Sequence, residues 1–400
     1  MNIVHIEDFF HPDAGYQINI LPKYMAKQGN KVTIVTSKMD KVPNDLTAFF
    51  GKDDIERRDA EYYRMTGVTI IRLKINGFIS GRAVFTKDIF KVIENLKPDI
   101  LYVHGNDTLT AMRYLLRLKK IDYPLVMDSH MLEMASVNRF NKVFRVIYKK
   151  FFAPKLIKNS IPVIRTTDDR YVEKFLGIPL QQCPSISFGS DILLFHPDKT
   201  VKSNFRKEND IHENDFVIVY TGKIDEFKGG MLLAEAFQKK FETKRSVVLI
   251  VVGNANGEYG KEVEQVLEKS KNRVIRFPTQ KYNDLPKFYQ VSDLSIFPRQ
   301  CSLSFYDAQA CGLPVLSEDN SINIDRVKYG NGTNFKAGSI EDFRTKIVEF
   351  VEMEKIEYEQ MSINALNFVK SKYNYENIAL QYTNILLGEV EKIDREKKSS

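Results

Sequence analysis

Short β-branched runs alternate with helical patterns along the first part of the chain. The runs are IVHI (3–6), KVTIVT (31–36), VTIIRL (68–73), DILYVH (99–104), PLVMD (124–128) and IPVIRT (161–166). One intervening segment carries Ile18, Leu21 and Met25 at helical spacing before Gly29, although Pro22 within it predicts a kink. Strands that alternate with helices predict a doubly wound parallel sheet.

The same alternation then starts a second time, after the aperiodic segment FGSDILLFHPDKT (188–200). The second series is DFVIVYTGK (215–223), SVVLIVVGN (246–254), NRVIRFP (272–278), DLSIFPR (293–299), LPVLSE (313–318) and TNFKAG (333–338). A chain of 400 residues also exceeds what one core usually supports. We therefore expect two Rossmann-like domains, residues 1–190 and 191–375, that face each other across a ligand-binding cleft.

A last helical pattern covers residues 376–393. It places Ile378, Tyr382, Leu386 and Ile393 on one face. An apolar face of this kind needs a partner, so we expect this helix to pack back onto the first domain.

The composition is that of an ordinary globular protein, with 43% apolar residues and a net charge of +7. Three cysteines at unrelated spacings argue against a disulfide framework and favour a reducing compartment. The acids Glu7 and Asp8 near the start do not fit a secretory signal. The apolar run VVLIVV (247–252) is far shorter than the roughly 20 residues that span a bilayer. We expect a cytoplasmic location.

One strongly basic segment, residues 139–158, holds seven basic residues and no acids. Six apolar residues interleave with them at helical spacing, namely Phe140, Val143, Phe144, Ile147, Phe151 and Phe152. Two interpretations stay open. The apolar stripe either packs into the core, or the helix lies on anionic lipid headgroups at the inner face of the cell membrane, where each nearby basic residue contributes about 1 kcal/mol.

The loop His11 to Gln17 follows the first expected strand and contains one glycine, Gly15, whose missing Cβ allows close backbone approach. It is not a G-x-G-x-x-G sequence, so a dinucleotide site is weakly supported. A plain β-to-α turn is the alternative interpretation.

The turn TGKIDEFKGG (221–230) carries Lys223 at the end of a strand and Lys228 before two glycines. Two ammonium groups around a tight turn can neutralise the oxygens of a diphosphate. No two aspartates in the chain are separated by a single residue, so a D-x-D metal clamp is absent from the sequence. The absence of such a clamp favours diphosphate binding by the two lysines over the alternative interpretation, a solvated basic turn.

Two histidines stand at the ends of strands: His104 ends DILYVH, and His130 follows PLVMD after one intervening residue, Ser129. A lone histidine is more often structural than catalytic, and we interpret His104 in that way. His130 stands at a strand-to-loop junction, where this fold places ligands, so a functional role is as well supported as a structural one.

The segment RQCSLSFYDAQACGLPVL (299–316) places Asp307 in a first helical turn. Ser304 can cap a helix that begins at Phe305, with Asp307 completing a variant capping box, while Gly312 and Pro314 end the helix. Alternatively, the amides of residues 302–305 point into the cleft as a phosphate seat, and Asp307 reaches a ribose diol beside them.

Taken together and in this order, these pieces resemble the retaining glycosyltransferases of family 4, which have the GT-B fold. The resemblance covers essentially the whole chain, with FGSDILLFHP in place of N-G-V-D-x-x-x-F-x-P and residues 293–319 in place of the nucleotide-sugar signature. It implies catalytic roles for His130, Lys223 and Lys228. It implies donor-binding roles for Gly15, Lys223, Lys228, Arg276, Phe277, Pro278, Arg299, Ser302, Leu303, Ser304 and Asp307.

Arg299 departs from the family pattern, which has a glutamate at this position to contact the donor sugar. One hypothesis is that the arginine fork binds a carboxylate, a phosphate or the carbonyl of an N-acetyl or uronic acid group. The other is that Arg299 pairs with Glu318 or Asp319 and leaves the backbone of residues 300–303 to hold the sugar.

The resemblance predicts a retaining, metal-independent hexosyltransferase. Its donor would be a nucleotide diphosphate sugar, UDP-linked, and its acceptor a glycan or a lipid-linked glycan in cell-surface polysaccharide synthesis. We expect no cofactor and no metal. We also expect no nucleic-acid partner, because the aromatic residues stand at core spacing. The alternatives are a non-catalytic sugar-nucleotide-binding or scaffolding relative and a nucleotide-sugar epimerase.

Overall fold

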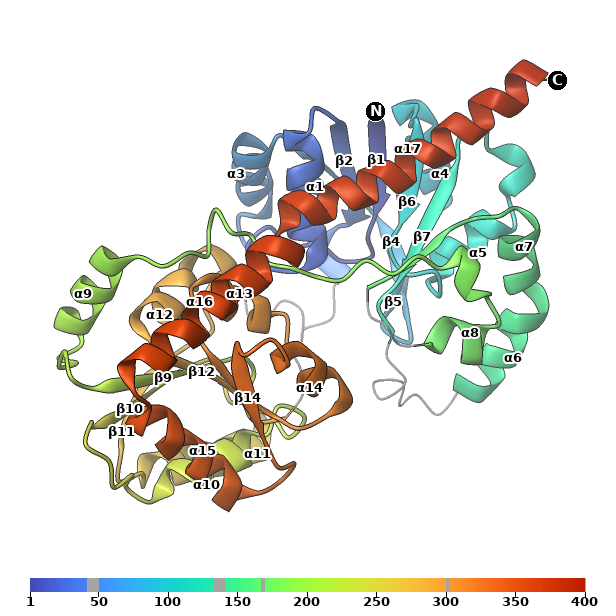
Figure 1. Ribbon diagram of the computed structural model, residues 1–400. Coiled ribbons are helices and arrows are strands. Elements are labelled where there is room, and N and C mark those ends of the chain that lie inside the picture. The colour runs from blue at the N-terminus through green and yellow to red at the C-terminus, as the bar shows by residue number, and fades with distance from the viewer. Residues whose placement is uncertain (42–49, 132–140, 167–169, 300–301, 400) are drawn as a thin grey trace. The chain divides into compact units, whose positions relative to one another are not determined.

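The computed structural model of the protein describes residues 1–41, 50–131, 141–166, 170–299 and 302–399. The chain divides into two compact units, each with its own parallel sheet (Figure 1). Unit 1 comprises Met1–Phe188 together with Tyr375–Ser400, and unit 2 comprises Gly189–Asn374.

Unit 1 contains a six-stranded parallel sheet in the order β3-β2-β1-β6-β7-β8. These strands are β1 (Asn2–Ile6), β2 (Lys31–Ser37), β3 (Thr69–Leu73), β6 (Ile100–Val103), β7 (Leu125–Ser129) and β8 (Val163–Arg165). The helices are α1 (Gln17–Lys27), α3 (Ile55–Thr66), α4 (Asp88–Leu96), α5 (Leu109–Leu115), α6 (Asn141–Phe151), α7 (Ala153–Lys158), α8 (Tyr171–Leu176) and α17 (Tyr375–Ser399).

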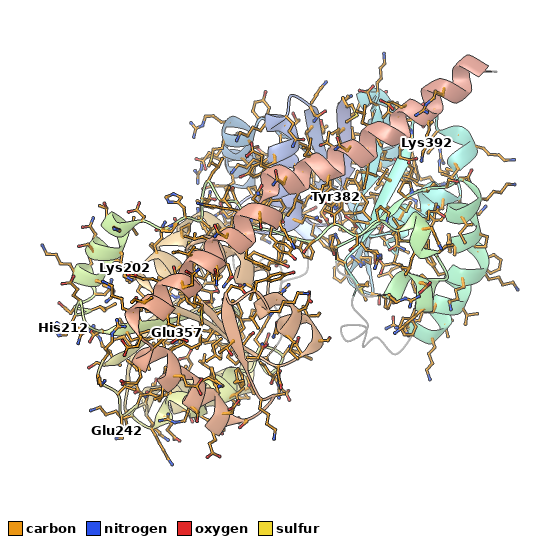
Figure 2. The ribbon with its side chains drawn as sticks, viewed as in Figure 1. Lys202, His212, Glu242, Glu357, Tyr382 and Lys392 are labelled. Carbon is orange, nitrogen blue, oxygen red and sulfur yellow. The ribbon has the colours of Figure 1, made fainter. Side chains whose placement is uncertain are left out.

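The long helix α17 packs within unit 1, where it contacts α1 and β6. Ile378, Tyr382 and Leu386 of α17 are buried, and Gln17 Nε2 donates to the hydroxyl of Tyr382 at 2.7 Å. Tyr382 and Lys392 mark the course of this helix over unit 1 in Figure 2. The apolar face that the sequence predicts for α17 is therefore one of its buried surfaces.

Unit 2 repeats the same topology, with strand order β11-β10-β9-β12-β13-β14. Its strands are β9 (Phe216–Thr221), β10 (Val247–Val252), β11 (Arg273–Phe277), β12 (Leu294–Phe297), β13 (Val315–Glu318) and β14 (Gly332–Phe335). Its helices are α9 (Lys199–Glu208), α10 (Gly230–Gln238), α11 (Gly257–Glu268), α12 (Pro286–Val291), α13 (Ser304–Ala310), α14 (Ser321–Val327), α15 (Ile340–Glu352) and α16 (Lys355–Lys372).

In both sheets the order in which successive strands are added changes side once. This switch lies between β1 and β6 in unit 1 and between β9 and β12 in unit 2. Ligands of doubly wound proteins bind outside the carboxyl ends of the strands at such a switch point. The fold class predicted from the sequence, two Rossmann-like doubly wound sheets, is confirmed.

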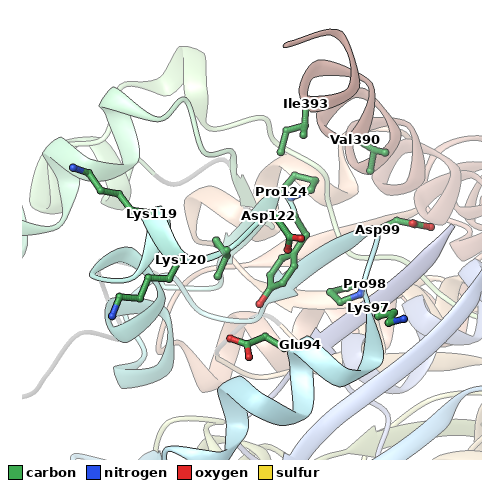
Figure 3. Close-up of a pocket in the computed structure, with 12 residues that line it drawn as sticks. Glu94, Lys97, Pro98, Asp99, Lys119, Lys120, Asp122, Pro124, Val390 and Ile393 are labelled. Atoms are coloured by element: carbon green, nitrogen blue, oxygen red, sulfur yellow. The ribbon is translucent and has the colours of Figure 1, made fainter. Parts of the chain in front are cut away.

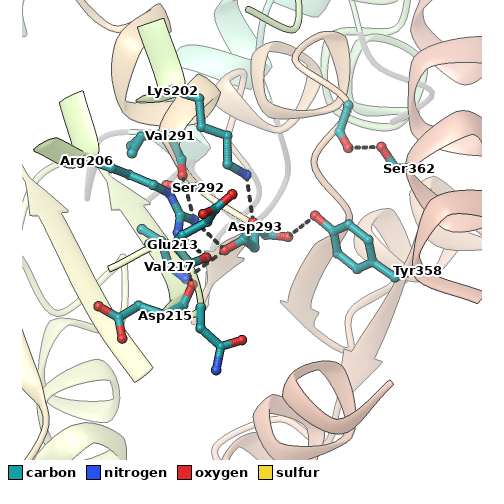
Figure 4. A network of polar contacts seen from close by, with 12 residues as sticks. Lys202, Arg206, Glu213, Asp215, Val217, Val291, Ser292, Asp293, Tyr358 and Ser362 are labelled. Atoms are coloured by element: carbon teal, nitrogen blue, oxygen red, sulfur yellow. Dashed lines mark hydrogen bonds and ion pairs between the residues drawn. The ribbon is translucent and has the colours of Figure 1, made fainter. Parts of the chain in front are cut away.

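A buried ion-pair network holds α9 to the sheet of unit 2 (Figure 4). The Asp293 carboxylate accepts hydrogen bonds from Lys202 Nζ at 2.8 Å, from Arg206 Nη2 at 2.8 Å and from the Val217 amide at 2.9 Å. Because its carboxylate is paired and hydrogen-bonded, burial of Asp293 is tolerated. The network has a structural role at the amino ends of β9 and β12.

Three features differ from the sequence-based expectation or were not anticipated by it. An antiparallel hairpin, β4 (Ile75–Ile79) and β5 (Arg82–Phe85), follows β3. The basic segment forms two helices, α6 and α7, which meet at Phe152. Pro22 lies inside α1, which is assigned as one helix from Gln17 to Lys27.

Among the described helices, none is both long enough and apolar enough to cross a membrane.

Candidate functional site

Two tightly packed turns, which follow β9 and β10, lie beside the switch point of unit 2. The backbone amide of Gly222, directly after β9, donates to Val252 at 3.0 Å, and a Cβ on Gly253 would lie 1.8 Å from the carbonyl oxygen of Gly222. Only glycine permits this approach. It places the turn with Lys223 and Lys228 at the carboxyl edge of the sheet.

The turn that holds the two lysines is closed by its own hydrogen bonds. The Lys228 amide donates to Asp225 Oδ1 at 2.9 Å, and the Gly230 amide donates to the Asp225 carbonyl at 3.0 Å. Lys223 is exposed and Lys228 is partly buried. The geometry suits binding of an anion at this edge, although a role in donor binding stays a prediction.

Arg299 lies at the same switch point, after β12, and contacts the lysine turn. Its Nη1 donates to the carbonyl of Glu226 at 2.8 Å, which also accepts from the Gly229 amide at 3.2 Å. A Cβ on Gly229 would lie only 3.2 Å from Cβ of Arg299. The structure thus places Arg299 against the turn that carries Lys223 and Lys228.

The expected partners of Arg299 make other contacts. Glu318 Oε1 accepts from the Gly338 amide at 3.1 Å, and Asp319 Oδ1 accepts from the Ala337 amide at 2.6 Å. Arg299 lowers the pKa of Glu318 only as a minor influence, since burial dominates and raises that pKa. The hypothesis of a hydrogen-bonded pair with either acid is replaced by the contact with Glu226.

The helix α13 begins at Ser304, one residue earlier than the sequence predicts, and Leu303 is its N-cap without a side-chain hydrogen bond. The predicted cap by Ser304 and the capping box with Asp307 are therefore wrong. The Phe305 amide donates to the Ser302 carbonyl at 3.3 Å, so it is not free for a phosphate as predicted. Ser302 Oγ and Ser304 Oγ are 2.7 Å apart.

Asp307 is buried and held by two hydroxyls. Its Oδ1 accepts from Ser190 Oγ at 2.6 Å and from the Tyr282 hydroxyl at 3.4 Å. Burial and, to a smaller extent, the neighbouring Asp191 raise the pKa of Asp307 to about 7, although the two hydrogen bonds oppose the rise. Asp307 is therefore partly protonated near neutral pH, whereas the sequence suggested an ionised acceptor.

The segment Arg276–Pro278 at the end of β11 is fixed by internal contacts. The Arg276 guanidinium donates to the carbonyl oxygens of Val251 at 2.7 Å and Gly253 at 3.0 Å, and it pairs with Glu264. The Phe277 carbonyl accepts from the Gly253 amide at 3.0 Å. The Arg276 side chain thus supports the turn after β10, and the role that the resemblance implies for the backbone of residues 276–278, to cradle the nucleotide base, stays a prediction.

The switch point of unit 1 contains a buried polar cluster that we call the Asp128 network. Its members are His5, Tyr102, His104, Asp128 and His130. Asp128 Oδ2 lies 2.8 Å from His104 Nδ1, 3.1 Å from His130 Nε2 and 2.9 Å from the Tyr102 hydroxyl, and Oδ1 accepts from the Gly105 amide at 2.6 Å. His104 is buried within this network, and its interpretation as a structural residue stays a prediction.

The charges of this network follow from its contacts. Burial opposes ionisation of Asp128, but the two histidines and its hydrogen bonds outweigh burial and hold its pKa well below the usual value. Burial likewise opposes protonation of His130, yet Asp128 and Glu7 raise its pKa. Ligand atoms of His104, Asp128 and His130 lie within 4.8 Å of one another, a spacing that could hold a cation. Hydrogen bonds to Asp128 also account for these distances.

Four charged residues at this edge were missed by the sequence analysis. Glu7 and Asp8 follow β1, and Arg82 Nη2 pairs with Asp107 at 3.1 Å. Burial and the neighbouring Glu7 raise the pKa of Asp8 to about 7, and burial raises the pKa of Glu7. The position of Glu7 and Asp8 directly after the first strand was the signal that could have identified them.

Gly15 lies in the loop between β1 and α1, also in unit 1. Here the Ala14 amide donates to the His11 carbonyl at 3.1 Å, and Arg58 Nη1 pairs with Asp13 at 2.9 Å. Gly15 itself is partly buried. The loop is an ordered β-to-α turn, and a contact between Gly15 and a donor stays a prediction.

The large pocket drawn in Figure 3 lies away from these edges. It has a volume of about 960 Å³ and is lined by residues that precede β6 and β7, such as Asp99 and Tyr123, and by Val390 and Ile393 of α17. Because it opens at the amino ends of the strands, it is not the switch-point site.

Comparison with known proteins shows what the chain is similar to. Residues 201–368, which lie within unit 2, match the family model described as glycosyl transferases group 1. The chain is 24% identical over 414 residues to a protein of Thermosipho melanesiensis named "Probable sucrose-phosphate synthase", and the match covers 94% of this chain and 91% of that protein.

Solved glycosyltransferase structures share the GT-B fold of this chain. A glycosyltransferase from Rickettsia africae superposes with a TM-score of 0.74 at 13% identity, covering 97% of this chain and 98% of the other. Anabaena Alr3699/HepE, in complex with UDP-glucose, superposes with a TM-score of 0.71 at 17% identity, covering 97% and 100%. At these identities the likeness concerns the fold.

Proposed function

We propose that this protein is a glycosyltransferase that moves a hexose from a UDP-linked sugar to a glycan or lipid-linked acceptor, with retention of anomeric configuration and without a metal ion. In this proposal unit 2 binds the nucleotide sugar and unit 1 binds the acceptor. The complex of Anabaena Alr3699/HepE with UDP-glucose supports UDP as the nucleotide. Retention follows from the resemblance to family 4.

The observation that carries the proposal is the group of three cations at the switch point of unit 2. Lys223, Lys228 and Arg299 come from the ends of β9 and β12, where a doubly wound sheet binds its ligand. In the reaction the bond between the anomeric carbon and the diphosphate breaks, and the acceptor oxygen takes its place and loses its proton. The two lysines neutralise the charge that develops on the leaving diphosphate.

The polar edge of unit 1 supports a carbohydrate acceptor. Glu7, Asp8 and Asp107 offer carboxylate oxygens, and Arg82 and His130 offer donors, beside the ends of β1, β6 and β7. Sugar hydroxyls both donate and accept hydrogen bonds, so a mixed edge of this kind suits them better than a purely basic one.

The proposed function is tested by incubating the protein with a panel of nucleotide sugars and following both hydrolysis and transfer to oligosaccharide acceptors. We expect turnover of at least one UDP-sugar in the presence of EDTA, and a product whose anomeric coupling constant matches that of the donor. Inversion of configuration, or activity only with added Mg²⁺, would contradict the mechanism. Interconversion of free UDP-sugars without transfer would indicate an epimerase.

We also propose that α6 and α7 contact an anionic membrane. Of the predicted apolar stripe, Val143, Ile147 and Phe151 are exposed, whereas Phe144 and Phe152 pack against the core of unit 1. The core-packing interpretation therefore holds for only part of the stripe. Only Tyr148 is fully buried among the described residues of α6. Residues 139 and 140 lie outside the described residues.

Sedimentation with phosphatidylserine vesicles tests the membrane contact. We expect replacement of Lys142, Lys150 and Lys158 by Gln to weaken binding, by about 1 kcal/mol for each lysine near the surface. Lys207, Lys239 and Lys261 of unit 2, replaced in the same way, are the matched control. Equal binding of both variants, or no binding of the wild type at low salt, would exclude this surface.

A further inference from the structure

Asp128 accepts more hydrogen bonds than any neighbouring group of its network. One carboxylate receives four donors, from Gly105, Tyr102, His104 and His130, at 2.6–3.1 Å. The carboxylate is completely buried, whereas 36% of the His130 side chain is exposed. A buried acceptor therefore meets a partly exposed imidazole at the carboxyl end of β7.

The other histidines extend the row of contacts behind Asp128. His104 Nδ1 lies 2.8 Å from Asp128 Oδ2 and donates to it, because a carboxylate only accepts. His5 Nδ1 lies 3.0 Å from His104 Nε2, and one of these two nitrogens donates to the other. His5 Nε2 is buried without a hydrogen-bond partner among the described residues.

His130 is held in one ring orientation. Its ring stacks on Phe188, with centroids 5.7 Å apart and planes inclined by 15°, and lies parallel to His104 at 6.5 Å. Its Nε2 faces Asp128 at 3.1 Å. A carboxylate at that distance selects the tautomer with the proton on Nε2, as in other carboxylate–histidine pairs. Nδ1 is the ring nitrogen that remains for a ligand.

We propose that Asp128 is a positioning residue that fixes His130 as the Nε2–H tautomer and so presents Nδ1 to a hydroxyl group of the bound carbohydrate. This inference rests on the proposed function for the identity of the ligand. The neutral Nδ1 accepts a hydrogen bond from the hydroxyl, and the protonated ring donates one to it. Asp128 acts through His130 and does not touch the carbohydrate.

The tautomer is measured directly by long-range proton–nitrogen NMR of protein labelled with ¹⁵N-histidine, at a pH high enough for His130 to be neutral. We expect the Nε2–H form in the wild type and a mixture with the Nδ1–H form in Asp128→Asn, whose side-chain amide also donates. Tyr102→Phe is the matched control, because it removes another donor from the same oxygen and leaves the His130 contact; it should keep the Nε2–H form.

The wild-type spectrum alone can overturn the inference, so the test does not depend on whether Asp128→Asn folds. An Nδ1–H ring in the wild type would contradict it. A deprotonated Nε2 whose signal shifts when stoichiometric Zn²⁺ is added would also contradict the inference. In that case His104, Asp128 and His130 would be holding a cation.

Kinetics separate positioning from a purely structural role. We expect Asp128→Asn to lower kcat at least about tenfold while the KM for the nucleotide sugar changes less than about threefold. Adding Asp128→Asn to His130→Ala should cost little more than His130→Ala alone, because both remove one interaction. Additive losses in the double variant would contradict the proposal. Absence of any transferase activity would refute the proposed function and leave the NMR result to decide the tautomer.

Discussion

At the residue scale, Asp307 is the side chain whose environment differs most from its sequence-based interpretation. The sequence places it in the first turn of a helix, and the structure agrees on the helix. Its partners Ser190 and Tyr282, however, stand 117 and 25 residues away in the chain. Burial beside these neutral hydroxyls leaves the carboxyl with a pKa of about 7.

The raised pKa of Asp307 predicts a definite pH dependence of stability. Between pH 4 and pH 7 the folded protein holds a proton on Asp307 that the unfolded chain has lost, so this carboxyl stabilises the fold below about pH 4 and its contribution is lost as the pH rises through about 7. The free energies of unfolding of the wild type and of Asp307→Asn, measured in urea, should therefore differ by an amount that changes over this window by on the order of 3 kcal/mol. Parallel pH profiles of the two proteins would contradict the assignment.

Arg299 provides a second prediction at the residue scale. Because it donates to the carbonyl of Glu226 in the lysine turn, Arg299→Ala should loosen that turn and weaken UDP and all UDP-sugars alike, by about three- to tenfold, the value of one hydrogen bond. Arg299→Lys, which keeps one donor, should recover part of the affinity. Calorimetric titrations in which only acidic or N-acetylated donors lose affinity would instead show that Arg299 contacts the sugar.

At the element scale, the contact between the turns after β9 and β10 explains why residue 253 is a glycine. A Cβ on Gly253 would lie 1.8 Å from the Gly222 carbonyl oxygen, and Gly253 has a φ of +151°. Gly253→Ala should therefore displace the lysine turn and destabilise unit 2 by roughly 2–4 kcal/mol. Gly388→Ala, in open space within α17, is the control and should stabilise by about 0.5–1 kcal/mol. An unchanged melting temperature for Gly253→Ala would contradict the packing.

The strands were predictable from the sequence and the contacts between elements were not. Runs such as VVLIVV are buried throughout their length, as parallel strands must be, and a local pattern of β-branched residues suffices to find them. The break at Phe152 and the hairpin β4–β5 depend on neighbours distant in sequence. The apolar stripe of α6 had correct spacing, yet spacing alone cannot tell a core from an exposed surface.

At the scale of the whole molecule, the chain ends by returning to unit 1. Deleting residues 375–400 should destabilise unit 1 selectively, because Ile378, Tyr382 and Leu386 are buried there at roughly 1.5–3 kcal/mol each. Hydrogen exchange should then speed up in β1 and β6 while β9 and β10 keep their protection. Equal exchange in both units, or no change in β1 and β6, would show that α17 does not support the first sheet.

The candidate site was predictable where a residue follows a strand directly. Lys223, Arg299 and His130 were identified by position, because the carboxyl ends of parallel strands meet at one edge. Their partners were not predictable, since the contact of Arg299 with Glu226 and of His130 with Asp128 depends on side-chain direction. Glu7 and Asp8 satisfied the positional rule and could have been found by applying it to the first strand.

The central claim is that Lys223 and Lys228 bind the diphosphate of a nucleotide sugar that the protein then uses for transfer. The most direct measurement is the affinity for UDP of the wild type, Lys228→Ala and the surface control Lys239→Ala by calorimetry in EDTA, followed by transfer assays with the UDP-sugar that binds. We predict metal-free binding by the wild type and the control, with affinity and turnover lowered at least about tenfold in folded Lys228→Ala. Equal affinity and turnover in all three proteins would contradict the account.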